Sequence, residues 1–239
     1  MQHAKPTLTV VTTSDPVARN LPRLLSALSR LAVHCAETIE VIIVDDLKYW
    51  PTKEAAAPPS YPGLLTRTIW YPERVGQLAA VIRGLQTATA EQVLTIDPDM
   101  YKCTTEVPKM RRLLTGDTCI VHGYRCNRRD ASYVRRAGSW LANALVRHIT
   151  GIQVPDIGSP IALLKHDVLA EHLIDEGNPR LNAYIELGTR VAAYPLENGA
   201  DRNTPSQYSP YNLLVTLFQL IRSASVARRK LKQSSQSIT

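Results

Sequence analysis

Two short apolar runs that each end in paired carboxylates constrain the fold of this chain more than any other feature. Val41-Ile42-Ile43-Val44 leads into Asp45-Asp46, and Val93-Leu94-Thr95-Ile96 leads into Asp97-Pro98-Asp99. Apolar runs of this length, bounded by turn residues, are typical of buried strands. Because carboxylates are costly to bury unless a cation or a hydrogen-bond donor compensates them, the two pairs indicate a site for a charged ligand where these strands end.

Strand and helix patterns alternate around these runs. Strands are predicted at residues 7–12, 40–44, 65–70, 93–96, 119–121, 160–164 and 191–196, and helices at residues 20–31, 76–90, 105–114, 134–150 and 168–173. Strands that alternate with helices predict an α/β fold with a mostly parallel central sheet between helical layers. Ligands bind such sheets at the carboxyl ends of the strands, where both carboxylate pairs fall.

The chain is long enough for one large domain. Its 239 residues are 44% hydrophobic, which is ample for a buried core. We expect this domain over residues 1–210, a helix over 211–232 and a polar, disordered tail over 233–239. The helix has an apolar stripe and ends in Arg228-Arg229-Lys230-Leu231-Lys232, so it fits either an anionic membrane surface or a core-packed helix with a solvated basic end.

Charge and composition narrow the partners. The net charge is +7, and the basic excess is concentrated at residues 109–112, 125–136 and 222–232. This balance fits phosphate-bearing substrates or anionic lipid, whereas no accompanying motif supports nucleic acid. None of the four cysteines forms a C-x-x-C pair, so neither a zinc site nor a redox motif is predicted. With no signal region and no membrane span, we expect a cytoplasmic protein, soluble or peripheral on the inner face of the membrane.

The second carboxylate pair suits a metal ion. Asp97 and Asp99 are one residue apart, and Mg²⁺ or Mn²⁺ prefers one or two carboxylates together with substrate phosphates. A nucleotide diphosphate held through that metal is the ligand we expect. On its own a D-x-D after a strand is weak support, because such pairs also occur at ordinary strand-to-turn junctions.

Further motifs follow in a fixed order. They are Glu106-Val107-Pro108-Lys109-Met110, Gly123-Tyr124-Arg125, Arg135-Arg136-x-x-Ser139-x-x-x-Asn143, Asp156-x-Gly158-Ser159 and Arg202-x-x-x-Ser206-x-Tyr208-Ser209. Before them stands a helix with Gly76, Ala80 and Gly84 at four-residue spacing, a stripe of small residues that predicts close packing of this helix on the sheet. The series, over residues 7–222, resembles the inverting family 2 glycosyltransferases of GT-A fold, and among them the dolichyl-phosphate mannose synthase branch and its bacterial polyprenyl-phosphate relatives.

The resemblance implies a role for each matching position. The nucleotide-sugar donor would contact Thr13, Asp15, Val17, Asp45, Asp46, Gly76 and Asp97, and the metal would be held by Asp97 and Asp99. The acceptor would contact Arg125, Arg135, Ser139, Arg202, Ser206 and Tyr208, with the arginines on its phosphate. Asp156 occupies the family's acidic position near the reacting centre, and it joins Arg125, Arg135 and Arg202 as a catalytic candidate.

The implied activity is metal-dependent transfer of a hexose, with inversion, from a UDP- or GDP-sugar to a polyprenyl phosphate. A phosphate nucleophile is already ionised and needs positioning more than a base. Two alternatives stay open: a soluble transferase acting on a small-molecule hydroxyl, for which Asp156 would be the candidate base, and a non-catalytic GT-A protein that binds a sugar nucleotide. The second follows from two departures from the family pattern, at Thr12–Val17 and at Tyr101, where a further metal ligand often stands.

Overall fold

The fold was examined in a computed structural model of the chain. It describes residues 5–14, 20–45, 60–71, 77–126, 140–141, 143–145, 147–148, 154–168, 187 and 190–198. The expected basic helix over 211–232 and the expected tail over 233–239 lie outside the described residues.

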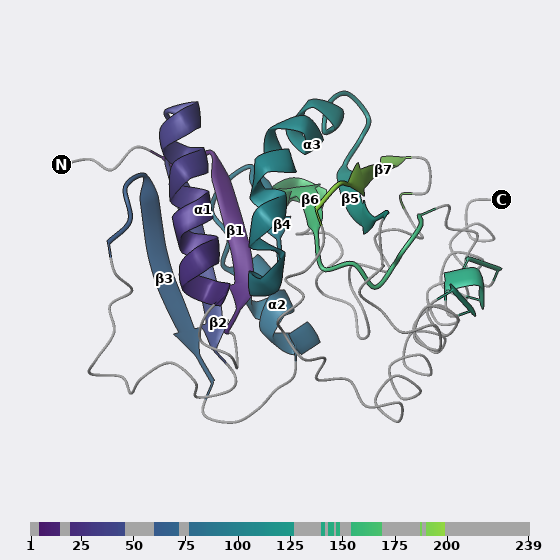
Figure 1. Ribbon diagram of the computed structural model, residues 1–239, viewed down its shortest axis with the longest axis horizontal. Helices are drawn as coiled ribbons and strands as arrows, with labels where there is room; N and C mark the ends of the chain where they lie inside the picture. The colour runs from purple at the N-terminus through teal and green to yellow at the C-terminus, as the bar shows by residue number, and fades with distance from the viewer. Residues whose placement is uncertain are drawn as a thin grey trace, which may run out of the picture.

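The described residues form one seven-stranded sheet in the order β3-β2-β1-β4-β6-β5-β7 (Figure 1). The strands are β1 Leu8–Thr13, β2 Ile39–Asp45, β3 Leu64–Trp70, β4 Gln92–Thr95, β5 Ile120–Arg125, β6 Ala162–Lys165 and β7 Val191–Leu196. Within this sheet β6 alone runs antiparallel to its neighbours, and all other pairings are parallel. The predicted α/β fold with a mostly parallel central sheet is confirmed.

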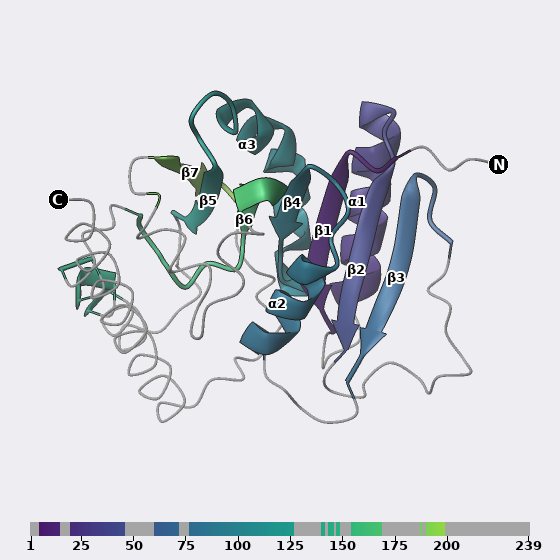
Figure 2. The same cartoon turned by 180° about the vertical axis from the view of Figure 1, so that it is seen from behind.

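Helices cover both faces of the sheet. The described helices are α1 Asn20–Cys35, α2 Gln77–Gln86, the 3-10 helix η1 Pro98–Glu106 and α3 Val107–Leu113. One core cluster joins α1, η1 and α3 to the sheet face that carries Val10 and Val41, and the other joins α2 to the face that carries Val11 and Ile42. Figures 1 and 2 show α1 and α2 on opposite sides of the strands, as a three-layer sandwich requires.

Close packing of α2 depends on small residues. A Cβ at Gly84 would lie 2.4 Å from Cγ1 of Val11 and 3.2 Å from Cγ2 of Val44. Ala80, one turn earlier, is fully buried. The four-residue spacing of small side chains predicted this approach, and the prediction is confirmed at Ala80 and Gly84, while Gly76 lies outside the described residues.

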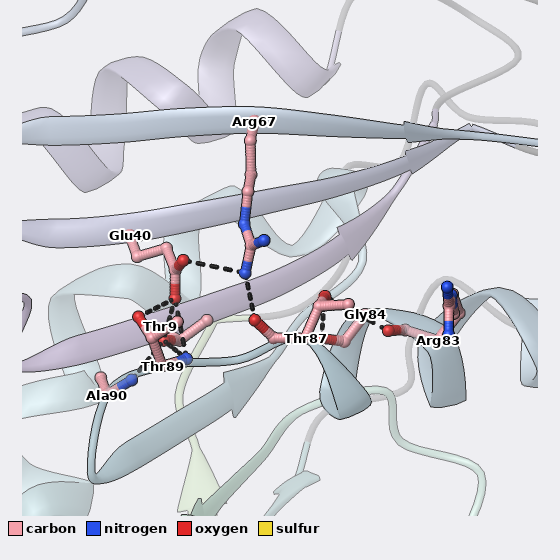
Figure 3. Close-up of polar contacts among 8 residues, drawn as sticks. All are labelled: Thr9, Glu40, Arg67, Arg83, Gly84, Thr87, Thr89 and Ala90. Atoms are coloured by element: carbon pink, nitrogen blue, oxygen red, sulfur yellow. Dashed lines mark hydrogen bonds and ion pairs between the residues drawn. The ribbon is translucent and has the colours of Figure 1, made fainter.

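A buried carboxylate fixes the connection between α2 and β4. Glu40 of β2 accepts hydrogen bonds from Oγ1 of Thr9 at 2.5 Å and from the amide and hydroxyl of Thr89 at 3.1 and 2.9 Å (Figure 3). It also pairs with Nη2 of Arg67 at 3.0 Å, and Arg67 donates to the carbonyl of Thr87. These contacts join β1, β2 and β3 to the loop before β4, and they lie near the amino ends of β1 and β2.

Candidate functional site

The chain changes direction across the sheet beside β1. It proceeds from β1 outward to β2 and β3, and then returns to the other side of β1 for β4. In open α/β sheets, ligands bind at the carboxyl ends of the strands where the order reverses in this way. Here that point is flanked by Thr13 and Ser14 at the end of β1 and by Ile96 and Asp97 after β4. The topology therefore indicates a ligand site beside the first predicted metal carboxylate.

The reversed strand brings a second group of residues to the same edge. Thr95 of β4 pairs with Ala162 of β6, and Ala162 pairs with His122 of β5. Because β6 runs antiparallel, the residues that precede it lie at the carboxyl ends of β4 and β5, where the amide of Gly123 donates to the carbonyl of Ile161 at 3.0 Å. The predicted donor residue Asp97 and the predicted acceptor-side residue Asp156 thus both lie at the carboxyl ends of β4 and β5.

The donor side of this edge holds buried polar residues. Asp45, the last residue of β2, is fully buried, and Thr13, the last residue of β1, is 9% exposed. The strand ends are held together by backbone hydrogen bonds, from Ser14 to the carbonyl of Val44 at 2.9 Å and from Tyr71 to the carbonyl of Asp45 at 3.0 Å. The predicted donor residues Thr13 and Asp45 therefore end neighbouring strands.

The predicted metal carboxylates stand on a tight turn. Asp97 is extended, Pro98 opens η1, and the amide of Met100 donates to the carbonyl of Asp97 at 3.0 Å. Proline suits a first helical position because its φ is already fixed near the helical value. Both Asp97 and Asp99 are partly exposed, as metal ligands at a substrate site must be. Two hard carboxylate oxygen donors on such a turn fit Mg²⁺ or Mn²⁺.

The described residues offer the metal these two carboxylates and no larger cluster. Within them, no group of three or more His, Cys, Asp or Glu side chains could hold an ion. Magnesium-type sites commonly have few protein ligands, and substrate phosphates and water complete the shell. The donor set therefore fits a metal that binds together with a diphosphate.

The ring of Tyr101 packs against the side chains of Arg23 and Lys102 and against the core. The guanidinium carbon of Arg23 lies 5.7 Å from its ring centre and Nζ of Lys102 lies 5.8 Å away, both within cation–π range. The ring also packs against the core cluster that joins α1 to η1. At the position where the family often has a further metal ligand, this chain thus has an aromatic residue that joins α1 to η1.

Cys103 links the metal turn to the acceptor side. Burial, followed by the negative charges of Glu106 and Asp99, raises the pKa of Cys103 to about 12, and the positive charge of Arg125 opposes the rise. The thiol stays protonated at neutral pH and donates to the carbonyl of Asn198 at 3.2 Å. The charges of Asp99, a predicted metal residue, and Arg125, a predicted acceptor residue, thus both reach this one thiol.

Arg125 and Asp156 form a two-point ion pair. Nε of Arg125 lies 2.7 Å from Oδ2 of Asp156, and Nη2 lies 3.0 Å from Oδ1. The side chains are 21% and 9% exposed. This parallel arrangement is the strong, geometrically specific form of an arginine–carboxylate contact. The sequence predicted both residues at the reacting centre but gave no sign that they pair.

Glu106 is a site-building residue for which the sequence alone suggested no role. Its carboxylate is buried and accepts hydrogen bonds from the amides of Glu197 and Asn198 at 3.1 and 3.2 Å, and from Nδ2 of Asn198 at 3.2 Å. These bonds fix the turn after β7 against η1. The signal in the sequence was its place at the start of the motif Glu106-Val107-Pro108-Lys109-Met110.

Several predicted site residues lie outside the described residues. On the donor side they are Asp15, Val17, Asp46 and Gly76, and on the acceptor side they are Arg135, Ser139, Arg202, Ser206 and Tyr208. The roles assigned to these residues, and those assigned to the site residues that the structure does describe, stay predictions. Separately, none of the described helices has the length and hydropathy that crossing a membrane requires.

The sheet order and the carboxylate turn at the reversal point define a glycosyltransferase fold of the GT-A type. Solved structures with this fold include glucosyl-3-phosphoglycerate synthase from Mycobacterium tuberculosis in complex with UDP, with a TM-score of 0.67 and 20% identity over 92% of this chain and 80% of that one. The same enzyme in complex with Mn²⁺, UDP-glucose and phosphoglyceric acid has a TM-score of 0.67 at 19% identity, with the same coverage of both chains. The predicted GT-A fold is confirmed.

The chain belongs to glycosyl transferase family 2, whose family model matches residues 10–173. Among curated relatives, a dodecaprenyl-phosphate galacturonate synthase from Rhizobium johnstonii is 29% identical over 46% of this chain and 32% of its own length. An undecaprenyl-phosphate 4-deoxy-4-formamido-L-arabinose transferase from Pseudomonas savastanoi pv. phaseolicola is 26% identical over 85% of this chain and 61% of its own length. The chain thus spans about a third to three-fifths of these relatives, and the family expected from the motifs is confirmed.

Proposed function

We propose that this protein is a metal-dependent glycosyltransferase that moves a hexose, with inversion, from a UDP- or GDP-sugar to a polyprenyl phosphate. The observation that carries the proposal is that a carboxylate turn suited to a metal-bound diphosphate and a partly buried arginine suited to a phosphate both lie at the carboxyl ends of the strands. Relatives named for transfer to polyprenyl phosphates support the acceptor class.

On the donor side, Thr13 and Asp45 would contact the nucleoside, together with Asp15, Val17, Asp46 and Gly76. A carboxylate accepts hydrogen bonds only, so Asp45 suits the N–H groups of a uracil or guanine base. Asp97 and Asp99 would hold Mg²⁺ or Mn²⁺. A divalent ion bound there supplies positive charge that offsets the charge developing on the leaving nucleotide.

On the acceptor side, Arg125, Arg135 and Arg202 would orient the phosphate, assisted by Ser139, Ser206 and Tyr208. A phosphate oxygen attacks the anomeric carbon of the sugar and forms the new C–O bond. The bond from that carbon to the diphosphate breaks, and the nucleoside diphosphate leaves with the electron pair. No proton has to be removed from an ionised phosphate, so the residues of this side act by positioning.

The lipid acceptor requires access to a bilayer. We propose that the basic segment that ends at Arg228–Lys232 attaches the protein peripherally to the inner face of the membrane. Each basic residue near an anionic leaflet contributes about 1 kcal/mol, and this attraction is screened by salt. The full chain should co-sediment with phosphatidylglycerol vesicles at low salt and dissociate at high salt. A variant that lacks residues 226–239 should remain in the supernatant, and retention of binding in that variant would exclude this segment as the attachment.

Transfer assays with matched acceptors test the activity. The full chain is incubated with Mn²⁺ or Mg²⁺, a panel of UDP- and GDP-sugars and one of three acceptors: undecaprenyl phosphate, undecaprenol or a soluble glycosyl-acceptor alcohol. We expect sugar transfer to undecaprenyl phosphate alone, abolished by EDTA and restored by metal. Transfer to the alcohols instead would support the small-molecule hydroxyl acceptor. Tight binding of a sugar nucleotide without transfer or hydrolysis would indicate a non-catalytic member of the family.

A further inference from the structure

Asp156 is held in an unusual backbone conformation. Its φ is +49°, in the left-handed region that non-glycine residues seldom adopt. Its carbonyl accepts a hydrogen bond from the amide of Ser159 at 2.8 Å and lies 3.0 Å from Nε2 of the buried His122. The next amide, of Ile157, donates to Oδ1 of Asn143 at 2.8 Å. Backbone strain of this kind persists only when surrounding contacts over-determine it, and it is concentrated at functional sites.

The side chain of Asp156 is fixed just as firmly. Both carboxylate oxygens accept charge-assisted hydrogen bonds from Arg125, through Nε and Nη2. The backbone amide of Arg125 adds a longer contact to Oδ2 at 3.4 Å. The carboxylate therefore meets the Nε edge of the guanidinium and sets the plane and direction of the whole group.

We propose that Asp156 is a positioning residue for the acceptor phosphate and does not act as a general base. It fixes the plane and direction of the Arg125 guanidinium, the group that contacts the acceptor phosphate in the proposed function. This inference rests on the proposed function. A base must take the acceptor's proton on a carboxylate oxygen, and here both oxygens are engaged by Arg125, so protonation would remove the negative charge that makes these two bonds strong.

The backbone conformation decides which substitutions are informative. Asn adopts the left-handed region more readily than most residues, so Asp156→Asn removes the charge and keeps the backbone. Asp156→Gly removes the whole side chain, and glycine has no penalty at this φ. Asp156→Ala is avoided because it would add backbone strain to the loss of the carboxylate. Asp117→Asn is the matched control, because Asp117 is an exposed residue in the turn before β5, at the opposite edge of the sheet.

A double-mutant cycle separates positioning from base catalysis. Initial rates of transfer to undecaprenyl phosphate are measured for the full-length wild type, Asp156→Asn, Arg125→Ala and the double variant. If Asp156 acts only through Arg125, each single change raises the acceptor KM about tenfold or more, the usual size of a lost charge-assisted bond. The double variant should then be no worse than Arg125→Ala alone. Effects that multiply, or a fall in kcat at unchanged acceptor KM, would overturn the inference.

Two further measurements keep the outcome clear if a variant folds poorly. Arg125→Ala leaves a buried carboxylate uncompensated, so its unfolding midpoint is recorded first. If Arg125→Ala does not fold, Asp156→Gly decides between the two roles. A raised acceptor KM supports positioning, and a fall in kcat at unchanged acceptor KM supports base catalysis. The ¹H–¹⁵N resonance of Arg125 Nε should also shift in Asp156→Asn and stay in place in Asp117→Asn. An unmoved resonance would contradict the pairing itself.

The wild-type assay distinguishes this inference from the proposed function. If the wild type transfers no sugar to undecaprenyl phosphate, the proposed function fails whatever the variants do. In that case the same cycle is run with the acceptor alcohol that the wild type uses. Multiplying effects there would identify Asp156 as the base, and non-additive effects would keep it as a positioning residue.

Discussion

One carboxylate–arginine pair lies near the amino ends of the parallel strands and another lies at their carboxyl ends, and the two pairs differ in what surrounds them. The side chains of Glu40 and Asp156 are equally buried, each 9% exposed, and each pairs with an arginine. Glu40 lies in a regular strand and is further bonded by threonines that tie the α2–β4 loop to β1. Asp156 lies in a left-handed backbone conformation beside the predicted metal turn. Burial of an ion pair therefore does not distinguish the two positions, and neither does a left-handed φ alone, which Ala36 before β2 also has, whereas position at the carboxyl ends of the strands does.

The largest expected effect is a loss of activity from a change at Asp99, at the carboxyl ends of the strands. Asp99→Asn should lower metal-dependent turnover by at least about 100-fold, because changes even to residues that support metal ligands cost 10–100-fold. The thermal unfolding midpoint should stay near that of the wild type, since Asp99 is partly exposed. Turnover is measured with a nucleotide sugar and Mn²⁺, with Asp117→Asn as the control. Undiminished turnover would remove Asp99 from the metal site.

A change at Glu40, near the amino ends of the strands, should lower stability and leave activity unchanged. Glu40→Ala should lower the free energy of unfolding by about 3 kcal/mol, mainly because the buried donors of Thr9 and Thr89 lose their acceptor, while the 43% exposed Arg67 keeps water and the Thr87 carbonyl as partners. The donor KM should not change, since Glu40 is far from the strand ends that hold the ligands. Urea unfolding and initial rates check this pair of outcomes. Equal loss of stability from Glu40→Ala and Asp156→Asn would contradict the expectation that the Glu40 pair contributes more to stability than the Asp156 pair does.

Glu106→Gln should have a smaller and mixed effect. Gln replaces one of the two carboxylate oxygens by an NH2 group, so either the amide of Glu197 or the donors of Asn198 lose their acceptor, which costs about 1–2 kcal/mol of stability at a buried site. Because the turn after β7 is then held less firmly, the acceptor KM should rise and the donor KM should stay the same. Separate titrations of donor and acceptor measure this. A change confined to the donor KM would mean that Glu106 supports the metal turn instead.

The smallest effect is expected from Cys103, and it depends on pH. Folding raises the pKa of this thiol from 9.0 to about 12, so its contribution to stability is complete below pH 9 and is lost as pH rises toward 12. Alkylation by iodoacetamide at pH 9 should therefore be much slower at Cys103 than at the exposed Cys35. Mass spectrometry after timed labelling compares the two sites. Similar rates would show that the region around Cys103 opens readily.

The features that follow from local pattern were predictable from the sequence. Apolar runs predicted β2 and β4 because buried parallel strands need such residues, and the spacing of Ala80 and Gly84 predicted the close approach of α2. The 3-10 helix η1 was not predicted, because residues 98–106 carry no periodicity that distinguishes it from a loop. A helix expected from residue 105 begins at Val107, where Pro108 can occupy the first turn.

Contacts made by the fold over long separations were not predictable. Arg125 and Asp156 are 31 positions apart and meet because β6 returns antiparallel beside β5. Glu106 and Asn198 are 92 positions apart and meet because β7 ends next to η1. A resemblance to the family identified Arg125 and Asp156 as important, but only the strand order shows that they act on each other.

The single reversed strand has a mechanical consequence. β6 is hydrogen-bonded to β4 on one side and to β5 on the other, so one continuous ladder crosses from the diphosphate side to the phosphate side. The residues predicted to hold the donor and those predicted to hold the acceptor are thus joined through one sheet, and tilting one group against the other would break backbone hydrogen bonds to β6. In the proposed reaction, β6 is therefore the one strand that lies between β4, which leads to Asp97, and β5, which carries Arg125.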